Sequence, residues 1–295
     1  MIIVIDAVNA HRFEHLLDEM FRLRKRVFAD RLGWDVECTE DGREIDPFDD
    51  LDPGYILGLD DTGHVVACVR ALQTTGPHML SEVFSDILDG EPPLRSPSIW
   101  ESTRFCVDTE RLGRGKARNS VSYATCELMI GALEYARRSG ISDIVTVIDP
   151  VMDRVLRRSD CAPYDYLGKR TPMGKVSALA ALLDCTEERI NRIRAFAGIG
   201  HDVQLSEEAA LALAPATVAD HAGDQPGSRD MSVVARNDAP DPRAGPASRA
   251  ALRDYCRGQI RDARTAEDLD HALALVELLL EEERQDPDRL SRAAG

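Results

Sequence analysis

Carboxylates gather in one short stretch of the chain, soon after a segment rich in basic residues. Seven of them lie within residues 40–52, at Glu40, Asp41, Glu44, Asp46, Asp49, Asp50 and Asp52. Five basic residues lie within residues 22–31, at Arg22, Arg24, Lys25, Arg26 and Arg31. Two interpretations stay open: a solvated acidic loop opposite a solvated basic helix face, or a pocket in which carboxylates pair with guanidinium groups. Such a pocket would hold a zwitterionic ligand and shift the pKa values of its own groups.

A second group of reactive residue types lies in the segment Trp100-Glu-Ser-Thr-Arg-Phe105. The apolar neighbours of this segment predict a central strand, in which successive side chains point to opposite faces. We therefore expect Glu101 and Thr103 on one face and Arg104 on the other. Glu101 is either an exposed carboxylate on an open face or a carboxylate held beside a hydroxyl. In a central strand, an unpaired charge would be costly.

A turn rich in glycine and arginine follows, Arg111-Leu-Gly-Arg-Gly-Lys-Ala117, before a predicted helix. Glycines at the start of a helix leave backbone N–H groups free to bind a phosphate, helped by the helix dipole and nearby basic side chains. Many Gly/Arg turns look alike, so the position of this one carries more weight than its composition. Acetyltransferases of the GNAT fold bind the pyrophosphate of coenzyme A at such a junction, and the turn resembles their glycine pattern in an altered register.

Hydrophobic periodicity predicts the elements that must position these groups. Apolar runs indicate strands at residues 1–6, 55–59, 64–72, 98–108, 143–148 and 176–183. Helical spacing indicates helices at residues 9–32, 118–139 and 152–158. The polar segment 34–52 has no periodicity and is either disordered or a functional loop. Strands and helices therefore interleave in an α/β or α+β pattern through about residue 198.

The composition changes after this region. Residues 201–248 are rich in Ala, Asp, Pro and Gly without periodicity, which predicts a disordered linker. Residues 249–295 regain helical spacing and predict a helical C-terminal extension of unknown role. We therefore expect one catalytic domain at residues 1–200, followed by the linker and the helical tail.

Bulk composition excludes several classes of protein. The net charge of −16 argues against a nucleic-acid binder. The seven cysteines are scattered without C-x-x-C spacing, so we expect free thiols in a reducing cytosol and no metal site. No apolar run approaches the roughly 20 residues that a membrane span requires, so we expect a cytoplasmic protein without membrane insertion.

The order and spacing of these groups resemble the N-terminal signature of acyl-homoserine-lactone (autoinducer) synthases. The matching residues are Arg24, Phe28, Arg31-Leu-Gly-Trp34-Asp-Val36, Glu44-Ile-Asp46-Pro-Phe-Asp49-Asp50, Arg70, Thr74-Thr-Gly-Pro-His-Met-Leu80, Val83-Phe84 and Trp100-Glu-Ser-Thr-Arg-Phe105. The sequence departs from the common family pattern at Gln73, and at His78, where a tyrosine is frequent. The resemblance ends near residue 200, so it covers the expected catalytic domain and not the tail.

The resemblance implies a GNAT-like three-layer α-β-α sandwich around a mixed central sheet. It also implies two chemical steps that make a quorum-sensing signal. The α-amine of S-adenosylmethionine attacks the thioester of an acyl donor, and the methionyl carboxylate then closes onto the γ-carbon, releasing methylthioadenosine and the lactone. S-adenosylmethionine is consumed as a substrate, so no cofactor is expected. The amine must lose a proton before it attacks, and a zwitterionic sulfonium requires both carboxylates and guanidinium groups.

The resemblance also assigns roles to individual residues. The S-adenosylmethionine pocket would be lined by Arg24, Phe28 and Trp34. The aromatic faces of Phe28 and Trp34 suit a sulfonium. The surrounding ion-pair network would consist of Asp46, Asp49, Arg70, Glu101 and Arg104. Glu101 would assist proton removal, directly or through a water, with Asp46 as the alternative, and Arg104 and Thr103 would complete the catalytic set. The acyl-donor end would involve Phe84, Thr103, Arg111, Arg114 and Thr146.

The donor implied by the resemblance is an acylated carrier protein or an acyl-coenzyme A. An acidic carrier protein would dock on a basic surface, for which the best candidate is Arg154, Arg157, Arg158, Lys169, Arg170 and Lys175. A second group, Arg111, Arg114, Lys116 and Arg118, would lie near the pantetheine route. The first group is equally well explained as a solvated surface. Thr146 either matches a threonine linked with 3-oxo-acyl preference or is simply a strand former. Two other classes stay open: a GNAT N-acetyltransferase using acetyl-coenzyme A, and a regulatory or scaffolding protein whose tail binds a partner.

Overall fold

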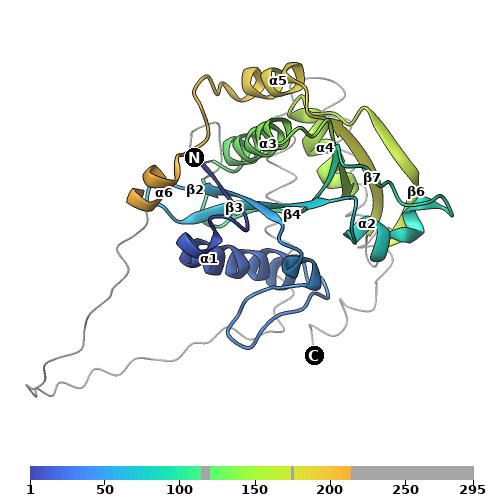
Figure 1. Cartoon of the computed structure of the whole chain (residues 1–295), viewed down its shortest axis with the longest axis horizontal. Helices are drawn as coiled ribbons and strands as arrows, with labels where there is room; N and C mark the ends of the chain where they lie inside the picture. Colours follow the sequence, from blue (N-terminus) through green and yellow to red (C-terminus); the bar gives the residue numbers. More distant parts are fainter. Residues whose placement is uncertain (114–119, 174–175, 214–295) are drawn as a thin grey trace, which may run out of the picture. The chain divides into compact units, whose positions relative to one another are not determined.

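A mixed sheet organises the part of the chain that the computed structural model describes, residues 1–113, 120–173 and 176–213. Its strands are β1 (Ile2–Ile5), β2 (Gly54–Leu59), β3 (Val65–Gln73), β4 (Ile99–Val107), β5 (Asp143–Ile148), β6 (Asp165–Met173) and β7 (Val176–Asp184). They lie in the order β1-β2-β3-β4-β5-β7-β6 (Figure 1). All neighbours are antiparallel except β4 and β5, which run parallel.

Helices cover both faces of this sheet. The longer ones are α1 (Glu14–Lys25), α3 (Val121–Arg138), α4 (Pro150–Arg158) and α5 (Glu187–Ala197), and the shorter ones are α2 (Met79–Glu82) and α6 (Glu207–Leu213). Short turns of other helix types are η1 (Ala10–Arg12), η2 (Arg26–Arg31, a π-helix), η3 (Pro47–Asp50) and η4 (Ser85–Leu88). Figure 1 shows α1 on one side of the sheet and α3 and α5 on the other. The three-layer α-β-α architecture expected from the sequence is confirmed.

Two apolar clusters explain these layers. On one face, Leu16 and Leu23 of α1 pack with Leu57 of the sheet, all of them fully buried. On the other face, buried residues of α3 such as Leu128 pack with Ile144 and Ile148 of β5. Alternation along each strand supplies both clusters at once, because successive side chains point to opposite faces. None of the described helices has the length and apolar character needed to cross a membrane.

The parallel pair β4–β5 separates part-way along its length. Residues Ile99 to Ser102 of β4 pair with Asp143 to Thr146 of β5, and beyond this point β4 pairs only with β3 while β5 pairs only with β7. The side chain of Thr146 donates to the carbonyl of Ser102 at 3.0 Å, at the last paired position. The sheet therefore opens between its two halves directly beyond Ser102.

Two of the longer elements, β6 and α5, were not expected from the sequence, and neither were the short helices α2 and α6. β6 is the edge strand, and its side chains are mostly exposed or half-buried without regular alternation, so no period-two pattern marks it. Gly168 has a positive φ of 61°, and a Cβ there would lie 1.8 Å from the carbonyl oxygen of Ile87. This glycine therefore allows η4 to pack against β6. The second element, α5, has Thr186 as its N-cap, and the Thr186 hydroxyl accepts from the backbone N–H of Arg189.

The predicted beginning of the linker at residue 201 is wrong. Val203 and Ala210 are buried. The backbone N–H of Ile2 donates to the carbonyl of Val203 at 2.7 Å, and the backbone N–H of Leu205 donates to the carbonyl of Ile2 at 2.8 Å. These bonds attach residues 203–205 to β1, and Ala210 of α6 packs into the cluster around α1. The apolar residues between 203 and 213 lie in a stretch too short to show a clear period, and tertiary contacts bury Val203 and Ala210. The rest of the predicted linker and the helical tail lie outside the described residues.

Candidate functional site

The acidic segment after α1 brings two carboxylates into a defined orientation. Asp46 is the N-cap of η3, and its Oδ1 accepts from the backbone N–H of Phe48 at 2.9 Å. Asp49 returns the interaction, because its Oδ2 accepts from the backbone N–H of Asp46 at 2.9 Å. Such a reciprocal cap is local and fixes the orientation of both side chains relative to the turn. The turn Asp46-Pro-Phe-Asp49 therefore presents two carboxylates together, facing β3.

Arg24 of α1 binds the same segment from the other side. Its Nη1 and Nη2 donate to the two oxygens of Asp49 at 2.8 and 2.9 Å, and its Nε donates to Glu44. Arg24 and Glu44 are fully buried. Burial opposes the charge on Arg24, but the two carboxylates outweigh it and raise the pKa of this guanidinium. Conversely, burial would raise the pKa of Asp49, yet Arg24 holds it well below its usual range.

Arg70 of β3 joins the same network through Asp46 and Asp49. Its Nη1 donates to Asp46 at 2.5 Å and to Asp49 at 2.7 Å, and its Nε donates to the hydroxyl of Thr103 at 3.0 Å. The side chain is fully buried. Tyr55 closes this end of the network, since its hydroxyl donates to Asp49 at 2.7 Å. These contacts hold Arg70 in one position without a ligand.

Arg104 joins the network through an irregularity in β4. The residue has a left-handed φ of 55°, and the β3–β4 register steps from Arg70↔Thr103 to Cys68↔Cys106, so β4 carries one extra residue. This β-bulge places Arg104 on the same face as Glu101 and Thr103. The sequence prediction that Arg104 faces the other side is therefore wrong, because strict alternation fails at a bulge. Strained backbone of this kind is concentrated at functional sites.

The Arg104 guanidinium lies at the more open side of the network. It donates to Glu44 Oε1 at 2.9 Å and forms an ion pair with Asp46 at 2.6 Å. Its Nη1 contacts only a thioether, the Sδ of Met79, at 3.4 Å. Arg104 and Asp46 are also the most exposed members, with side chains 10% and 9% exposed. A ligand would therefore reach the network here.

Charges within this network balance. Three guanidinium groups, Arg24, Arg70 and Arg104, face three carboxylates, Glu44, Asp46 and Asp49, and most of these side chains are nearly inaccessible to solvent. Buried charges persist in proteins when they are paired and hydrogen-bonded. Of the two interpretations of the acidic stretch, the pairing of carboxylates with guanidinium groups is the one that these three carboxylates show. Glu40, Asp41, Asp50 and Asp52 are exposed, as the solvated-loop interpretation expects.

Aromatic rings line the outer side of the network. Phe28, in the π-helix η2, stacks on Trp34 with ring centroids 5.2 Å apart and planes inclined by 17°. The Arg104 guanidinium lies 5.6 Å from the Phe28 ring centroid. Trp34 keeps 45% of its surface exposed. A stacked, partly open pair of rings beside a guanidinium is a surface on which a cation or a planar group can bind.

Glu101 lies next to this network on the same face of β4. Its two oxygens accept from the backbone N–H groups of Met79 and Leu80 at 2.7 and 2.6 Å, at the start of α2. The residue is fully buried. Burial raises the pKa of this carboxyl to about 7, although the two N–H donors and the nearby Arg70 act in the opposite direction. The exposed-carboxylate interpretation of Glu101 is therefore wrong, and this group can take up or release a proton near neutral pH.

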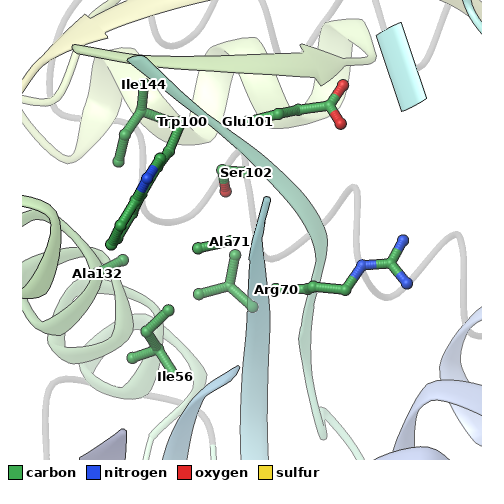
Figure 2. A pocket seen from close by; sticks show the side chains of 9 residues that line it. Ile56, Arg70, Ala71, Trp100, Glu101, Ser102, Ala132 and Ile144 are labelled. Carbon is green, nitrogen blue, oxygen red and sulfur yellow. The ribbon is translucent and has the colours of Figure 1, made fainter. Parts of the chain in front are cut away.

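The opposite face of the same strands carries an apolar cavity. Figure 2 shows Glu101 and Arg70 pointing to one side of the strands, while Trp100, Ile144 and Ile56 gather on the other. Val69, Ala71, Ser102 and Ala132 complete the lining, and the cavity has room for about one water molecule. The indole of Trp100 packs against Tyr135 of α3, with ring centroids 5.2 Å apart. This cavity lies beside the point where β4 and β5 separate.

The remaining residues expected at the donor end are dispersed. Phe84 is half-buried against Phe48, Leu72 and Met79, close to the network. Arg111 forms a 3.0 Å ion pair with Asp60 in the β2–β3 turn, and none of its described contacts joins it to the network. Arg114, Lys116, Arg118 and Lys175 lie outside the described residues.

The expected docking surface is exposed in its described part. Arg154, Arg157, Arg158, Lys169 and Arg170 all face solvent. Two of them are already paired, Arg157 with Asp153 at 3.1 Å and Lys169 with Asp89. Within the described ranges, no cluster of three or more His, Cys, Asp or Glu residues is suited to hold a metal ion.

Sequence reasoning missed three members of this site. Glu44 was noted as part of the acidic stretch and of the family signature but was given no role, yet it bridges Arg24 and Arg104. Tyr55 looked like an ordinary strand residue, and Met79 looked like part of a motif. Two N–H groups of Arg70 and Arg104 approach the Met79 thioether at 3.3 and 3.4 Å. The only available signal was the local density of carboxylates, which cannot tell a bridging carboxylate from a solvated one.

Comparison with known proteins agrees with this geometry. The family model of the autoinducer synthases matches residues 9–193. An acyl-homoserine-lactone synthase of Agrobacterium fabrum is 37% identical over 182 residues, which cover 62% of this chain and 85% of that protein. One from Aeromonas salmonicida is 34% identical over 206 residues, covering 69% and 94%.

Solved structures of synthases share the fold. The CoA-dependent acyl-homoserine lactone synthase BjaI, solved with SAM and isopentyl-CoA, has a TM-score of 0.62 and 27% identity, and covers 72% of this chain and 97% of its own. The synthase LasI has a TM-score of 0.57 and 30% identity, with coverage of 66% and 94%. The GNAT-like fold expected from the sequence is confirmed, and the synthase is supported over the acetyltransferase alternative. The chain therefore belongs to the autoinducer synthase family and is an acyl-homoserine-lactone synthase.

Proposed function

We propose that the ion-pair network binds S-adenosylmethionine and that an acyl thioester enters where β4 and β5 separate. The observation that carries this proposal is the buried, charge-balanced network of Arg24, Arg70 and Arg104 with three carboxylates. The methionyl end of S-adenosylmethionine carries an ammonium and a carboxylate and so adds no net charge to such a network, while its sulfonium would lie outside the network against the stacked rings of Phe28 and Trp34. A ligand of one sign would leave an uncompensated buried charge, which is costly.

The most open part of the network suits the methionyl group. The Nη1 of Arg104 contacts only the Met79 thioether, which is a weak acceptor, so a ligand carboxylate would replace it favourably. The stacked rings of Phe28 and Trp34 then face the sulfonium or the adenine. In this arrangement Arg24, Asp49 and Arg70 form the rigid support, while Asp46 and Arg104 contact the ligand.

The first step forms an amide. The α-amine loses a proton and attacks the thioester carbonyl, and the C–S bond breaks to release the donor thiol. We assign proton removal to Glu101, acting directly or through a water, because its pKa of about 7 matches the working pH of a general base. Asp46 is less suited, since both of its oxygens accept from guanidinium groups. Thr103, hydrogen-bonded to Arg70, lies on the same face as Glu101.

The second step closes the lactone. The methionyl carboxylate attacks the γ-carbon, and the bond from that carbon to the sulfonium breaks to release methylthioadenosine. Guanidinium groups fixed in advance can orient the carboxylate for this attack without reorganising during the reaction. S-adenosylmethionine is consumed, so the proposed reaction requires no cofactor. S-adenosylmethionine and acyl thioesters are both present in the cytoplasm, and we therefore place the enzyme there.

The acyl tail is assigned to the α3 face behind β4, where the cavity, which has room for about one water molecule, must widen to admit it. The thioester carbonyl would lie in the opening beyond Ser102 and Thr146, and the tail would extend along the α3 face toward Trp100. The indole packed on Tyr135 closes the far end, so we expect short acyl chains to be preferred. The donor is an acyl carrier protein or an acyl-coenzyme A, and the exposed basic residues of α4 and β6 are the docking surface proposed for a carrier protein.

The test is incubation of the full chain with S-adenosylmethionine and acyl donors of graded length, supplied both on carrier protein and on coenzyme A. Mass spectrometry should detect methylthioadenosine and an N-acyl-homoserine lactone in equal amounts. Release of neither product with any donor would overturn the proposal. A higher kcat/KM for one donor class identifies the donor, and alanine substitution of Arg154 and Arg158 should weaken only the carrier-protein reaction.

A further inference from the structure

Two cysteines face each other on β3 and β4, the two strands that carry Arg70 and Arg104. Cys68 of β3 and Cys106 of β4 are opposite partners in the antiparallel register, and their Sγ atoms are 3.4 Å apart. They are 0% and 3% exposed. Among residues 1–113, 120–173 and 176–213, no other two cysteines lie within sulfur hydrogen-bonding distance of each other. The pair is therefore distinct from the other thiols of the described chain.

Its position couples it to the site. Cys68 precedes Arg70 by two residues, and Cys106 follows Arg104 by two residues. The Sγ of Cys68 also donates to the carbonyl oxygen of Arg104 at 3.5 Å, which is the carbonyl of the bulge residue with φ 55°. The two sulfurs therefore lie on the backbone that sets the direction of both guanidinium groups.

We propose that Cys68 and Cys106 form an oxidation site, and that a cross-strand disulfide between them reversibly inactivates the enzyme. One Sγ–Sγ bond forms and two S–H bonds break. With hydrogen peroxide as the oxidant, the O–O bond breaks and both thiol protons and both electrons leave in two molecules of water. The loss of activity rests on the proposed function, whereas formation of the disulfide does not.

Formation of the bond displaces both sulfur atoms from their present positions. A disulfide bond is about 2.05 Å long, so the two sulfur atoms have to approach by more than about 1 Å. In a close-packed core, the groups in contact with the two sulfur atoms have to adjust to this displacement. The hydrogen bond from Cys68 to Arg104 is lost with its S–H, and the bulge loses one of its supports. A misplacement of about 1 Å at a catalytic site can reduce activity by about a hundredfold.

Burial sets the rate of this oxidation. It raises the pKa of the Cys106 thiol, so little of the reactive thiolate is present in the closed sheet. We therefore expect slow oxidation, on a timescale of minutes to hours, limited by local opening of β3 and β4. The exposed Cys38 should react first and form no such pair.

The experiment treats the full chain with hydrogen peroxide and follows three readouts over time. Non-reducing tryptic digestion should yield one cross-linked species that joins the peptide ending at Arg70 to the peptide beginning at Phe105. The mass of this cross-linked peptide should be lower by two hydrogens than the sum of the two reduced peptides. Methylthioadenosine release should fall at least tenfold in step with the cross-link and return after treatment with dithiothreitol.

Three variants sharpen the test. Cys68→Ala and Cys106→Ala should neither cross-link nor lose activity on this timescale, while Cys38→Ser should behave like the wild type. Peroxide treatment that modifies Cys38 but yields no Cys68–Cys106 peptide would overturn the proposal, as would a cross-linked protein of full activity. Peptide mapping of the wild type decides the cross-link even if an alanine variant fails to fold. It also decides it if the untreated protein releases no lactone, which would contradict only the proposed function.

Discussion

Removal of one carboxylate from the ion-pair network should destabilise the whole domain. Glu44 accepts from Arg24 Nε and from Arg104 Nη2, and its side chain is fully buried. A Glu44→Gln substitution keeps the size of the side chain. It converts three guanidinium groups facing three carboxylates into three facing two, and it turns an amide donor toward guanidinium donors. One buried positive charge is then uncompensated.

The magnitude follows from this lost compensation. Breaking a buried ion pair by removing one partner costs about 3–5 kcal/mol of unfolding free energy. For a domain of this size, each kcal/mol lowers the melting temperature by about 2–4 °C, so we expect a decrease of roughly 6–20 °C. This is a large part of the roughly 5–15 kcal/mol by which domains are typically stable. Activity should fall as well, because Arg104 loses a fixed partner.

The assay is chemical and thermal denaturation of the full chain beside a matched surface variant. Glu187→Gln removes a carboxylate of the same type whose side chain is 68% exposed and paired with Arg137 at 3.0 Å. A surface pair of this kind contributes about 0–1 kcal/mol. If Glu44→Gln lowers the melting temperature no more than Glu187→Gln does, the description of Glu44 as a buried charge bridge is refuted.

Three further predictions concern the base, the acyl cavity and the domain boundary. Burial raises the pKa of Glu101 from 4.5 to about 7, so its contribution to folding is complete below pH 4.5 and is lost as the pH rises through 7. Urea denaturation should therefore show the unfolding free energy of the wild type falling, relative to that of Glu101→Gln, by about 1 kcal/mol per pH unit between pH 4.5 and 7. If the unfolding free energies of the two proteins change in parallel with pH, the burial of this charge is contradicted. Trp100→Ala should shift the lactone products toward longer acyl chains and Trp100→Phe much less; an unchanged product distribution in both would remove the acyl tail from this cavity. Truncation after residue 221, the end of the first compact unit, should preserve the melting temperature and the activity. Truncation after Gly200 removes the buried Val203 and Ala210 and should lower both, and equal stability of the two truncations would show that residues 201–213 contribute nothing.

The elements of the fold were largely predictable because burial leaves a period in the sequence. The strand at residues 143–148 and the helix that ends near Gly140 were predicted close to their observed bounds. The edge strand β6 was not, because side chains that face solvent on both sides carry no alternation. Residues 203–213 were taken for linker because residues 201–248 are rich in Ala, Asp, Pro and Gly without periodicity, and only their contacts with β1 and the α1 cluster show that they belong to the domain.

The direction of a single side chain was the least predictable feature. Arg104 was expected on the wrong face, because alternation assumes regular backbone and the bulge inserts one residue at a left-handed φ. The same bulge brings Arg104 to Glu44, a residue 60 positions earlier in the chain. No local pattern encodes such a pairing, since it depends on the register between strands and on how the acidic segment folds under them.

The sequence by itself determined the family, the succession of strands and helices, and the chemical types gathered for a zwitterionic substrate. These follow from residue identity and local spacing, which act over a few residues. Only the tertiary structure decided which carboxylates are buried bridges, that Arg104 joins the network, and that Glu101 is held by two backbone amides with its pKa near neutrality. Those properties arise from desolvation and long-range pairing, and both exist only once distant segments have packed together.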